Sequence, residues 1–597
     1  MKNQSFPLQT DDDWKLKAEE SLKGKSIQTL HTTTYENITL KPLYSQEDGT
    51  DATQFPGGQD FRRGIHSLGY FENKWKIAQN ISYQTPSELV ERIEKAVQRG
   101  QTALSFELND SLFDHEHVFL KIIKEYAGKY PLAINAKELQ SNGLDSIAKL
   151  DADEYQKVSG YLTSDPISSF ALNGEIPQNS EAFFTDWARS IIAANQKFPN
   201  LRTILINSST YHNGGANAVQ ELAIATATGV FYLQHLLENG AKLNQALSKM
   251  IFQFSIGSNF FMEIAKLRAA RILWSKITEA YGAEVEWRGM EITAQTSSFT
   301  KTIYDPHVNL LRAGNEALAA VLGGIQYLQV DPYDQITGSS NFSERIAQNT
   351  QLILQEEANL QKVIDPAGGS WYIEKLTKEL ADHTWKLFKE IDQKGGMLEV
   401  LKSGWLQNEI SIVNEKRQQD IFTRKASIIG TNVYANLDEQ GPECSHCEKE
   451  QNNSFHSEKI KIDHIPQLRL SQLFENLRKR AEKIEQKSGT RPSVTLLCLG
   501  SLKQYKARAD FVKGFLAAGG IKGVESAPIF SIEAAVLTVQ ESNTKYLCLC
   551  GSNEQYAELG FDIIQLLKSE FPDRIVYLAG LPEKDEQSNW LSAGIHS

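Results

Sequence analysis

The chain has 597 residues, of which 41% are apolar, so two or three folded domains are expected and disorder is excluded as the dominant state. Its 74 acidic and 62 basic residues give a formal charge of −12, which argues against nucleic acid or an anionic membrane as a partner. The sequence contains no run of eighteen apolar residues and opens without an apolar signal segment, which predicts an intracellular, cytoplasmic protein.

Residues 1–60 are predicted to form an N-terminal arm. The segment 11–24 (DDDWKLKAEESLKG) has the pattern of a polar amphipathic helix, and short extended pieces follow it at 38–44 and in the Gly/Pro-rich stretch 54–60. We expect this arm to pack on a larger body.

Residues 61–414 alternate between short β-rich runs and amphipathic helices, which predicts a parallel sheet. The helical pattern is strongest at 217–240 and 260–282. An eighth unit at 368–376 (GGSWYIEKL) would complete a (β/α)8 barrel, and an open doubly wound sheet is the alternative. The predicted strands are 103–108, 131–136, 159–164, 203–209, 251–257, 284–293 and 325–330.

The composition becomes polar between residues 415 and 490, which predicts an irregular linker. Strand and helix patterns resume in residues 491–597 and predict a small doubly wound, flavodoxin-like domain, with strands at 494–500, 546–552 and 574–580. Because the sequence stops at WLSAGIHS, we expect the last strand and helix of that fold to be missing.

The predicted linker contains the pair Cys444 and Cys447, with His446, His456 and His464 nearby. A zinc site needs four converging ligands, and the surrounding residues are polar and include no second cysteine pair. A plain loop is therefore favoured over a zinc site or a redox pair, and no metal site is predicted. Glycine pairs at 214–215, 323–324 and 368–369 are attributed to turns, because none follows a nucleotide-binding spacing.

Tyr211 and His212 follow the apolar strand predicted at 203–209. In a parallel barrel, residues at the carboxyl end of a strand face the active site. A phenol and an imidazole at that end could polarise a carbonyl group, and a hydrogen-bonded structural pair is an equal alternative.

Three long segments resemble the adenosylcobalamin-dependent methylmalonyl-CoA mutase family. They are FFMEIAKLRAARILW (260–274), SERIAQNTQLILQEE (343–357) and KVIDPAGGSWYIEKLT (362–377), and the similarity runs nearly end to end. The resemblance implies a substrate-binding barrel, a linker and a cobalamin-binding α/β domain.

The first loop of that domain normally carries Asp-x-His-x-x-Gly, in which the histidine coordinates cobalt, the aspartate orients the histidine, and the glycine leaves room for the nucleotide tail. In GSLKQYKARADF (500–511) the matching positions hold Leu502, Gln504 and Ala507. The resemblance therefore implies a degenerate loop with no cofactor bound by this chain, and no confident cofactor-binding residue.

The barrel departs from the family pattern as well. The usual Thr-Ile-Arg-Gln-Tyr-Ala-Gly is replaced by KIAQNIS, with Ala78 at the arginine and Asn80 at the tyrosine, and Thr293 stands where catalytic members carry a histidine. Gln295, Tyr211 and His212 match the family, so these three are the candidate catalytic remnants.

The leading hypothesis is a small, non-catalytic subunit of a heterodimeric isomerase that interconverts methylmalonyl-CoA and succinyl-CoA in propionate metabolism. A homologous large subunit would hold the adenosylcobalamin and the substrate. Two alternatives stay open: an active acyl-CoA mutase that binds cobalamin without a lower histidine ligand, and a stand-alone barrel that acts as a binding or regulatory protein.

Overall fold

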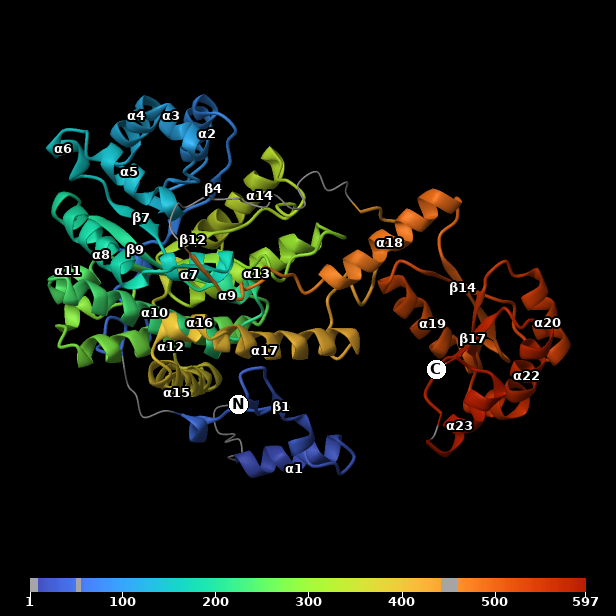
Figure 1. Ribbon diagram of the computed structural model, residues 1–597. Coiled ribbons are helices and arrows are strands. Elements are labelled where there is room, and N and C mark those ends of the chain that lie inside the picture. The colour runs from blue at the N-terminus through green and yellow to red at the C-terminus, as the bar shows by residue number, and fades with distance from the viewer. Residues whose placement is uncertain (1–8, 50–54, 442–458, 583, 597) are drawn as a thin grey trace. The chain divides into compact units, whose positions relative to one another are not determined.

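The computed structural model describes residues 9–49, 55–441, 459–582 and 584–596 (Figure 1). The chain divides into two compact units, which are described separately. The first unit comprises residues 1–300, 310–417 and 448–468, and the second comprises 301–309, 418–447 and 469–597. Over the described ranges, every helix is too short or too polar to cross a membrane.

The first unit is built around a curled parallel sheet of seven strands in the order β3-β12-β11-β10-β9-β7-β6. This order advances along the chain without the reversal that a doubly wound sheet requires. The bounds are β3 Lys76–Ile77, β6 Leu132–Asn135, β7 Gly160–Ser164, β9 Leu201–Asn207, β10 Met250–Ile256, β11 Ile292–Thr296 and β12 Tyr327–Gln329.

Two further strands connect the ends of this row. Strand β4 (Asn80–Ile81) follows β3 directly and pairs in parallel with β5 (Ser105–Phe106). Leu104, just before β5, bridges Leu132 of β6. The parallel α/β fold expected from the sequence is confirmed, and the curled sheet is consistent with a TIM-like barrel.

The prediction of a strand at 368–376 is wrong, because Trp371–Gln393 form helix α15. Ser370 caps this helix by accepting the Ile373 amide at 3.5 Å, and Glu374 lies in the first turn, where a negative charge is favourable. The first strand of the sheet lies at 76–81 instead. Gln79 and Asn80 interrupt its apolar pattern, so the strand was not recognised in the sequence.

Gln79 also explains how the sheet continues across the break between β3 and β4. Its side-chain amide donates to the Val330 carbonyl and accepts from the Val330 amide, both at 2.7 Å. The side chain thereby replaces a main-chain pair of the sheet where the strand itself is interrupted.

Helices cover the outside of the sheet, and the two strongest helical predictions are confirmed as α10 and α12, both of which contact α15. Buried residues lie on nearly every face of α12, and they include the charged residues Lys266 and Arg268. The main helices are α2 Pro86–Gln98, α4 Glu116–Tyr126, α5 Gln140–Ile147, α7 Pro166–Asn173, α8 Ser180–Lys197, α10 Ala218–Glu238, α12 Phe260–Ala280, α13 Val308–Leu322, α14 Asn341–Leu352 and α16 Met397–Lys402.

The inside of the curled sheet is filled by one layer of side chains with unequal sizes. Tyr161 and Tyr327 meet edge to face with ring centroids 5.2 Å apart, and the Tyr161 hydroxyl lies 3.2 Å from the Thr293 hydroxyl. Alanine residues and two larger aliphatic ones fill the rest of the layer, and Ala133 lies directly beside Tyr161 on the neighbouring strand. The apolar members are Ala78, Ala103, Ala133, Tyr161, Leu205, Ile251 and Tyr327.

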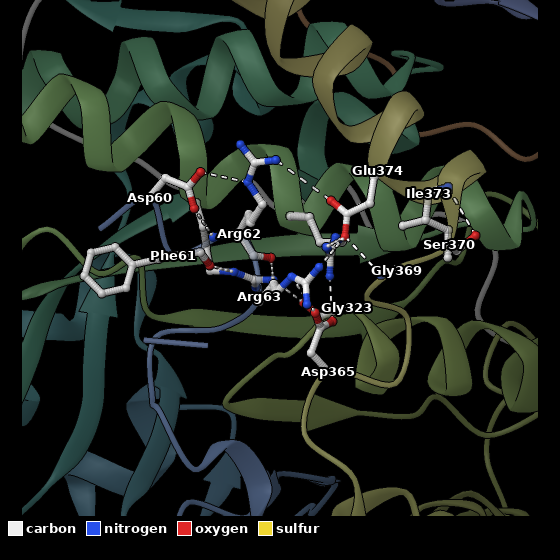
Figure 2. Close-up of polar contacts among 12 residues, drawn as sticks. Asp60, Phe61, Arg62, Arg63, Gly323, Asp365, Gly369, Ser370, Ile373 and Glu374 are labelled. Atoms are coloured by element: carbon white, nitrogen blue, oxygen red, sulfur yellow. Dashed lines mark hydrogen bonds and ion pairs between the residues drawn. The ribbon is translucent and has the colours of Figure 1, made fainter. Parts of the chain in front are cut away.

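A buried charge cluster joins α12 to α15 and to the segment that precedes it. Arg268, whose side chain is fully buried, contacts Asp365 at 2.6 Å and Glu374 at 2.7 Å. Arg63 reaches the same two carboxylates at 3.5 and 3.3 Å (Figure 2). Burial raises the pKa of Asp365 even though the neighbouring guanidinium groups favour its charged form. Ionised carboxylates at this depth therefore require their arginine partners.

The N-terminal arm contains helix α1 (Asp11–Ser21), as predicted, and this helix buries none of its residues. Thr10 caps it, with the Asp13 amide donating to the Thr10 hydroxyl at 3.2 Å and the Asp13 carboxylate accepting from the Thr10 amide at 2.9 Å. Trp14 and Leu16 are exposed. The helix is thus stabilised locally, by its cap and not by packing.

The segment 415–490 is more ordered than the sequence predicts. Helix α17 (Trp405–Phe422) extends into it, β13 (Lys459–Lys461) pairs antiparallel with β8 (Glu175–Pro177), and α18 (Gln472–Ser488) ends it. Ile465 lies in the main core of the first unit. The charged sequence of α18 concealed a regular helix, while Cys444, Cys447, His446 and His456 lie outside the described residues.

The second unit contains a four-stranded parallel sheet in the order β15-β14-β16-β17, flanked by α19 (Leu502–Ala518), α20 (Ile532–Glu541), α22 (Phe561–Glu570) and α23 (Lys584–Ala593). This is the doubly wound order expected for a flavodoxin-like sheet. The strands are β14 Ser493–Cys498, β15 Lys522–Glu525, β16 Tyr546–Cys550 and β17 Ile575–Leu578.

Two details of this sheet were not predicted. Strand β15 lies at an edge and alternates between exposed and half-buried residues, so its sequence lacks an apolar run. Ile595 forms an isolated parallel bridge with Val576 of β17, at an edge of the sheet where we expected no pairing.

Three thiols lie on one face of this sheet. Cys498 of β14 stands opposite Cys550 of β16, with Cys548 two residues earlier, and all three are buried. They belong to one apolar cluster with Tyr505 and Ala509, as expected for core cysteines. Burial raises the pKa of Cys498.

Candidate functional site

The candidate residues of the first unit lie at the carboxyl ends of its strands. Tyr211 and His212 belong to the short helix α9 (Ser209–Asn213), which follows β9 directly, and Gln295 lies near the end of β11. Tyr211 is 1% exposed and His212 is 6% exposed. The structure places all three at the end of the sheet where barrel enzymes position their reactive groups.

His212 uses both of its ring nitrogens within the protein. Nδ1 lies 2.8 Å from Glu221 and Nε2 lies 2.7 Å from the Ser297 hydroxyl. A carboxylate only accepts hydrogen bonds, so Nδ1 carries the proton that is donated to Glu221. Neither nitrogen is left to approach a substrate carbonyl in this arrangement.

A buried lysine anchors this histidine through Glu221. Lys266 of α12, with a fully buried side chain, lies 3.0 Å from Glu221 and 2.6 Å from Glu263, and it donates to the Ser255 carbonyl at 2.8 Å. Burial opposes ionisation of Glu221, but Lys266 and His212 together hold its pKa below the ordinary value. The network holds the His212 ring in one orientation through its Nδ1 atom.

The Tyr211 hydroxyl is not part of that network. It is buried and lacks a hydrogen-bond partner in the described portion of the chain. Burial raises its pKa well above the ordinary value, so the phenol stays protonated. The two residues are therefore not a mutually hydrogen-bonded pair, as one sequence hypothesis had it, because only His212 is held by neighbours.

Gln295 is engaged with other side chains as well. Its Oε1 accepts from Gln253 at 3.1 Å and its Nε2 donates to the Ser255 hydroxyl at 3.4 Å. Ser255 connects Gln295 to the Lys266 network. Its hydroxyl accepts from Gln295, and its carbonyl accepts from Lys266.

The substituted positions of the barrel separate into two places. Ala78 and Thr293 face the interior layer, where Ala78 is 2% exposed and Thr293 meets the Tyr161 hydroxyl. Asn80 is exposed and lines a cavity of about 370 Å³ between α2, β4 and the residues after β12. The family resemblance assigns all three positions to the substrate and cofactor site. In the structure, Ala78 and Thr293 lie at the interior layer, whereas Asn80 lines the cavity.

Replacing Thr293 by histidine is expected to destabilise the chain by about 1–3 kcal/mol, because the larger ring overpacks the closed layer beside Tyr161. Thermal unfolding measures the loss. Thr293→Ser keeps the hydroxyl and adds no volume, so it should cost less than the histidine. A histidine variant as stable as the parent would show that the layer has spare room.

In the second unit, Leu502, Gln504 and Ala507 lie in the first turns of α19. Leu502 is 59% exposed. The Gln504 side-chain oxygen accepts from the Ser501 amide at 2.7 Å and from the Ser501 hydroxyl at 2.8 Å, so the side chain caps its own helix. Gln504 therefore has a structural role, which the spacing Ser-x-x-Gln before a helix could have revealed in the sequence.

Side-chain contacts of Arg508 connect the helix α19 to the residues that follow β16. Arg508 donates to the Gly551 carbonyl and to Asn553, both at 2.5 Å, and its guanidinium lies 4.7 Å from the Tyr556 ring centre. Ligands of doubly wound folds bind at this point of the sheet.

The residues present do not fit a cobalt-coordinating loop. The three matching positions supply no imidazole and no carboxylate, and the one amide among them already binds Ser501. Within the described residues, the structure contains no group of three or more His, Cys, Asp or Glu side chains that could hold a metal ion.

Replacing Gln504 by alanine is expected to lower the stability of the second unit by about 0.5–2 kcal/mol, because two donors at the start of α19 lose their acceptor. Hydrogen exchange of the α19 amides measures the effect. Gln504→Glu retains the accepting oxygen and is the matched control, so equal exchange in both variants would contradict the capping role.

Sequence comparisons align the chain with proteins of one family. The family model described as methylmalonyl-CoA mutase matches residues 33–113 and 134–499. The methylmalonyl-CoA mutase small subunit of Streptomyces virginiae is 31% identical over 603 residues, covering 99% of this chain and 95% of the relative. The small subunit from Porphyromonas gingivalis is also 31% identical, with 97% and 91% covered.

A third relative, named methylmalonyl-CoA mutase without a subunit, comes from Cereibacter sphaeroides. It is 33% identical over 457 residues, which cover 71% of this chain and 64% of the relative. The similarity to the two small subunits thus extends over more of the chain.

Proposed function

Because the chain belongs to the methylmalonyl-CoA mutase family, we propose that it is the small, non-catalytic subunit of a heterodimeric, adenosylcobalamin-dependent enzyme of that family. The enzyme would interconvert methylmalonyl-CoA and succinyl-CoA, with cofactor and substrate held by a homologous large subunit. The names of the relatives, which call them small subunits, support a larger partner.

The observation that carries the proposal is the first turn of α19. Cobalt coordination from the protein needs a free imidazole, and the matching position holds Gln504, whose oxygen accepts two hydrogen bonds from Ser501. Beside this turn, Arg508 stacks on Tyr556 and binds Gly551 and Asn553. A cofactor would have to displace these internal contacts and would gain no ligand in return.

The barrel residues support the same proposal. His212 is bonded on both nitrogens, and Thr293 closes the interior layer against Tyr161. Binding a substrate carbonyl at His212 would first require breaking the hydrogen bond to Ser297, which costs part of the binding energy. In this arrangement the polar groups of His212 and Thr293 are used for hydrogen bonds within the chain.

Two measurements test the proposal. Purification from the native host should yield this chain together with a homologous chain that carries Asp-x-His-x-x-Gly. Equilibrium dialysis of the isolated chain with adenosylcobalamin should show no stoichiometric retention. Retention with cobalt coordinated from the protein would support the active mutase instead, and a chain that purifies alone from a host with an active large subunit would support the stand-alone barrel.

A further inference from the structure

Helix α18 of the second unit buries two charged side chains and exposes three apolar ones. Glu475 and Arg478 are each 2% exposed. Leu473, Leu477 and Ile484 are 42%, 43% and 52% exposed. Apolar side chains on an ordinary surface helix face the core, so the orientation of this helix requires an explanation.

The buried charges fix that orientation. Glu475 accepts from the Ile303 amide at 2.8 Å and from the Ser471 hydroxyl at 2.7 Å, and it pairs with Arg469 at 2.8 Å. A buried carboxylate separated from such partners would cost a large desolvation penalty.

Arg478 holds the same face of α18. Its guanidinium lies 3.7 Å from the centre of the Tyr304 ring and donates to the Asn436 carbonyl at 2.5 Å. The helix cannot rotate its leucines inward without breaking both sets of contacts, so the second unit leaves these apolar side chains uncovered.

The exposed side has the spacing of a helix-packing seam. Positions 473, 477, 480, 484 and 487 are separated by four, three, four and three residues, which is the repeat that keeps one stripe of a helix facing a second helix. Three positions are apolar, and the other two are Arg480 and Lys487, both exposed.

The two cations identify the chemistry of the partner. Arg480 lies between Leu477 and Ile484 along the stripe, so its charge falls within the contact and not at its edge. Immersing that position in lipid would bury a cation, which is costly. A protein helix that places carboxylates opposite Arg480 and Lys487 neutralises both, so the pattern favours an acidic amphipathic helix.

We propose that α18 is a docking seam for an amphipathic helix of a protein partner. The partner's apolar residues pack between Leu473, Leu477 and Ile484, and its carboxylates pair with Arg480 and Lys487. The partner is assigned as the large subunit, and this assignment rests on the proposed function.

The test is a titration of the full-length chain with the purified large subunit, followed by calorimetry at low and high salt. Leu477→Glu combined with Ile484→Glu should weaken binding at least about tenfold, since it places carboxylates against an acidic helix. Arg480→Gln combined with Lys487→Gln should weaken binding at low salt and reduce its salt dependence. Leu537→Glu on α20, at a side chain 58% exposed, is the matched control and should bind like the parent.

All of these positions are exposed, and circular dichroism should show unchanged folding. Parent-like binding by the double glutamate variant overturns the seam while leaving the proposed function intact. A parent chain that does not bind the large subunit overturns the proposed function and the partner assignment together. Self-association, or binding to anionic vesicles, that the double glutamate variant abolishes would overturn the assignment in favour of a second copy or a membrane.

Discussion

A chain with Leu502→Asp, Gln504→His and Ala507→Gly is expected to show no detectable turnover of methylmalonyl-CoA, even if it regains some affinity for the cofactor. The three changes rebuild one side of a cofactor site only. Rearrangement also needs a barrel that positions the acyl-CoA and excludes water. Ala78, Asn80 and Thr293 do not supply the contacts that the family resemblance implies for the substrate. Losing one or two charge-assisted contacts at about 1.5–3 kcal/mol each weakens substrate positioning by about one to four decades.

The measurement is succinyl-CoA formation by the triple variant, purified free of any large subunit, with the large subunit as the positive control. The structure adds a cost to the repair itself. Gln504→His removes the cap of α19, and glycine at position 507 in a helix costs about 1 kcal/mol relative to alanine. Stability is therefore measured in parallel, and substantial turnover by the folded triple variant would show that the barrel substitutions are compatible with catalysis.

Replacing Arg268 by leucine is expected to lower the free energy of unfolding by about 3–5 kcal/mol, because Asp365 and Glu374 lose their closest cation while they stay buried. Urea denaturation, followed through hydrogen exchange of the α12 amides, measures the loss. Arg189→Leu is the control, since the Arg189 side chain is 70% exposed and its pairing with Asp186 contributes little.

The sign of the pH dependence follows from the pKa of Asp365. Burial raises that pKa in the folded state, so the protonated form is favoured there, and stability from this group is present at low pH and lost as the pH rises through the folded pKa. The penalty of the leucine variant should therefore shrink on acidification. A penalty that stays constant, or that Glu374→Gln does not relieve, would contradict the role of uncompensated charge.

Much of the fold could be predicted, because most strands of the two parallel sheets are short apolar runs that local pattern reveals, β15 being an exception. The exceptions have local causes. Strand 76–81 contains Gln79, whose amide substitutes for main-chain pairing, and α18 carries so many charges that its composition resembles a linker. Its charged residues are buried only because Tyr304 and the Ile303 amide meet them, and those contacts are between residues more than 160 positions apart in the sequence.

The candidate site also combines a local motif, which the sequence reveals, with contacts between distant residues, which it does not. The spacing of the loop at 502–507 could be compared with a family motif, so the absence of a histidine at the matching position is readable from the sequence. The engagement of His212 was not, because it depends on Ser297 and Lys266, which lie far from His212 in the sequence, as well as on Glu221 in the next helix. Both members of the Arg268 and Asp365 pair lay inside the segments that resemble the family, yet only the structure shows that they meet.

The placement of the thiols makes it possible to measure opening of the second unit by thiol alkylation. Every cysteine of the sequence lies at or after position 444, and the first unit has none. With Cys444 and Cys447 replaced by serine, an alkylating reagent would react only when the second unit opens, because burial raises the pKa of Cys498 and keeps its reactive thiolate scarce. The alkylation rate would then be compared with and without a bound partner. The ratio of the two rates measures how much association reduces opening of the second unit.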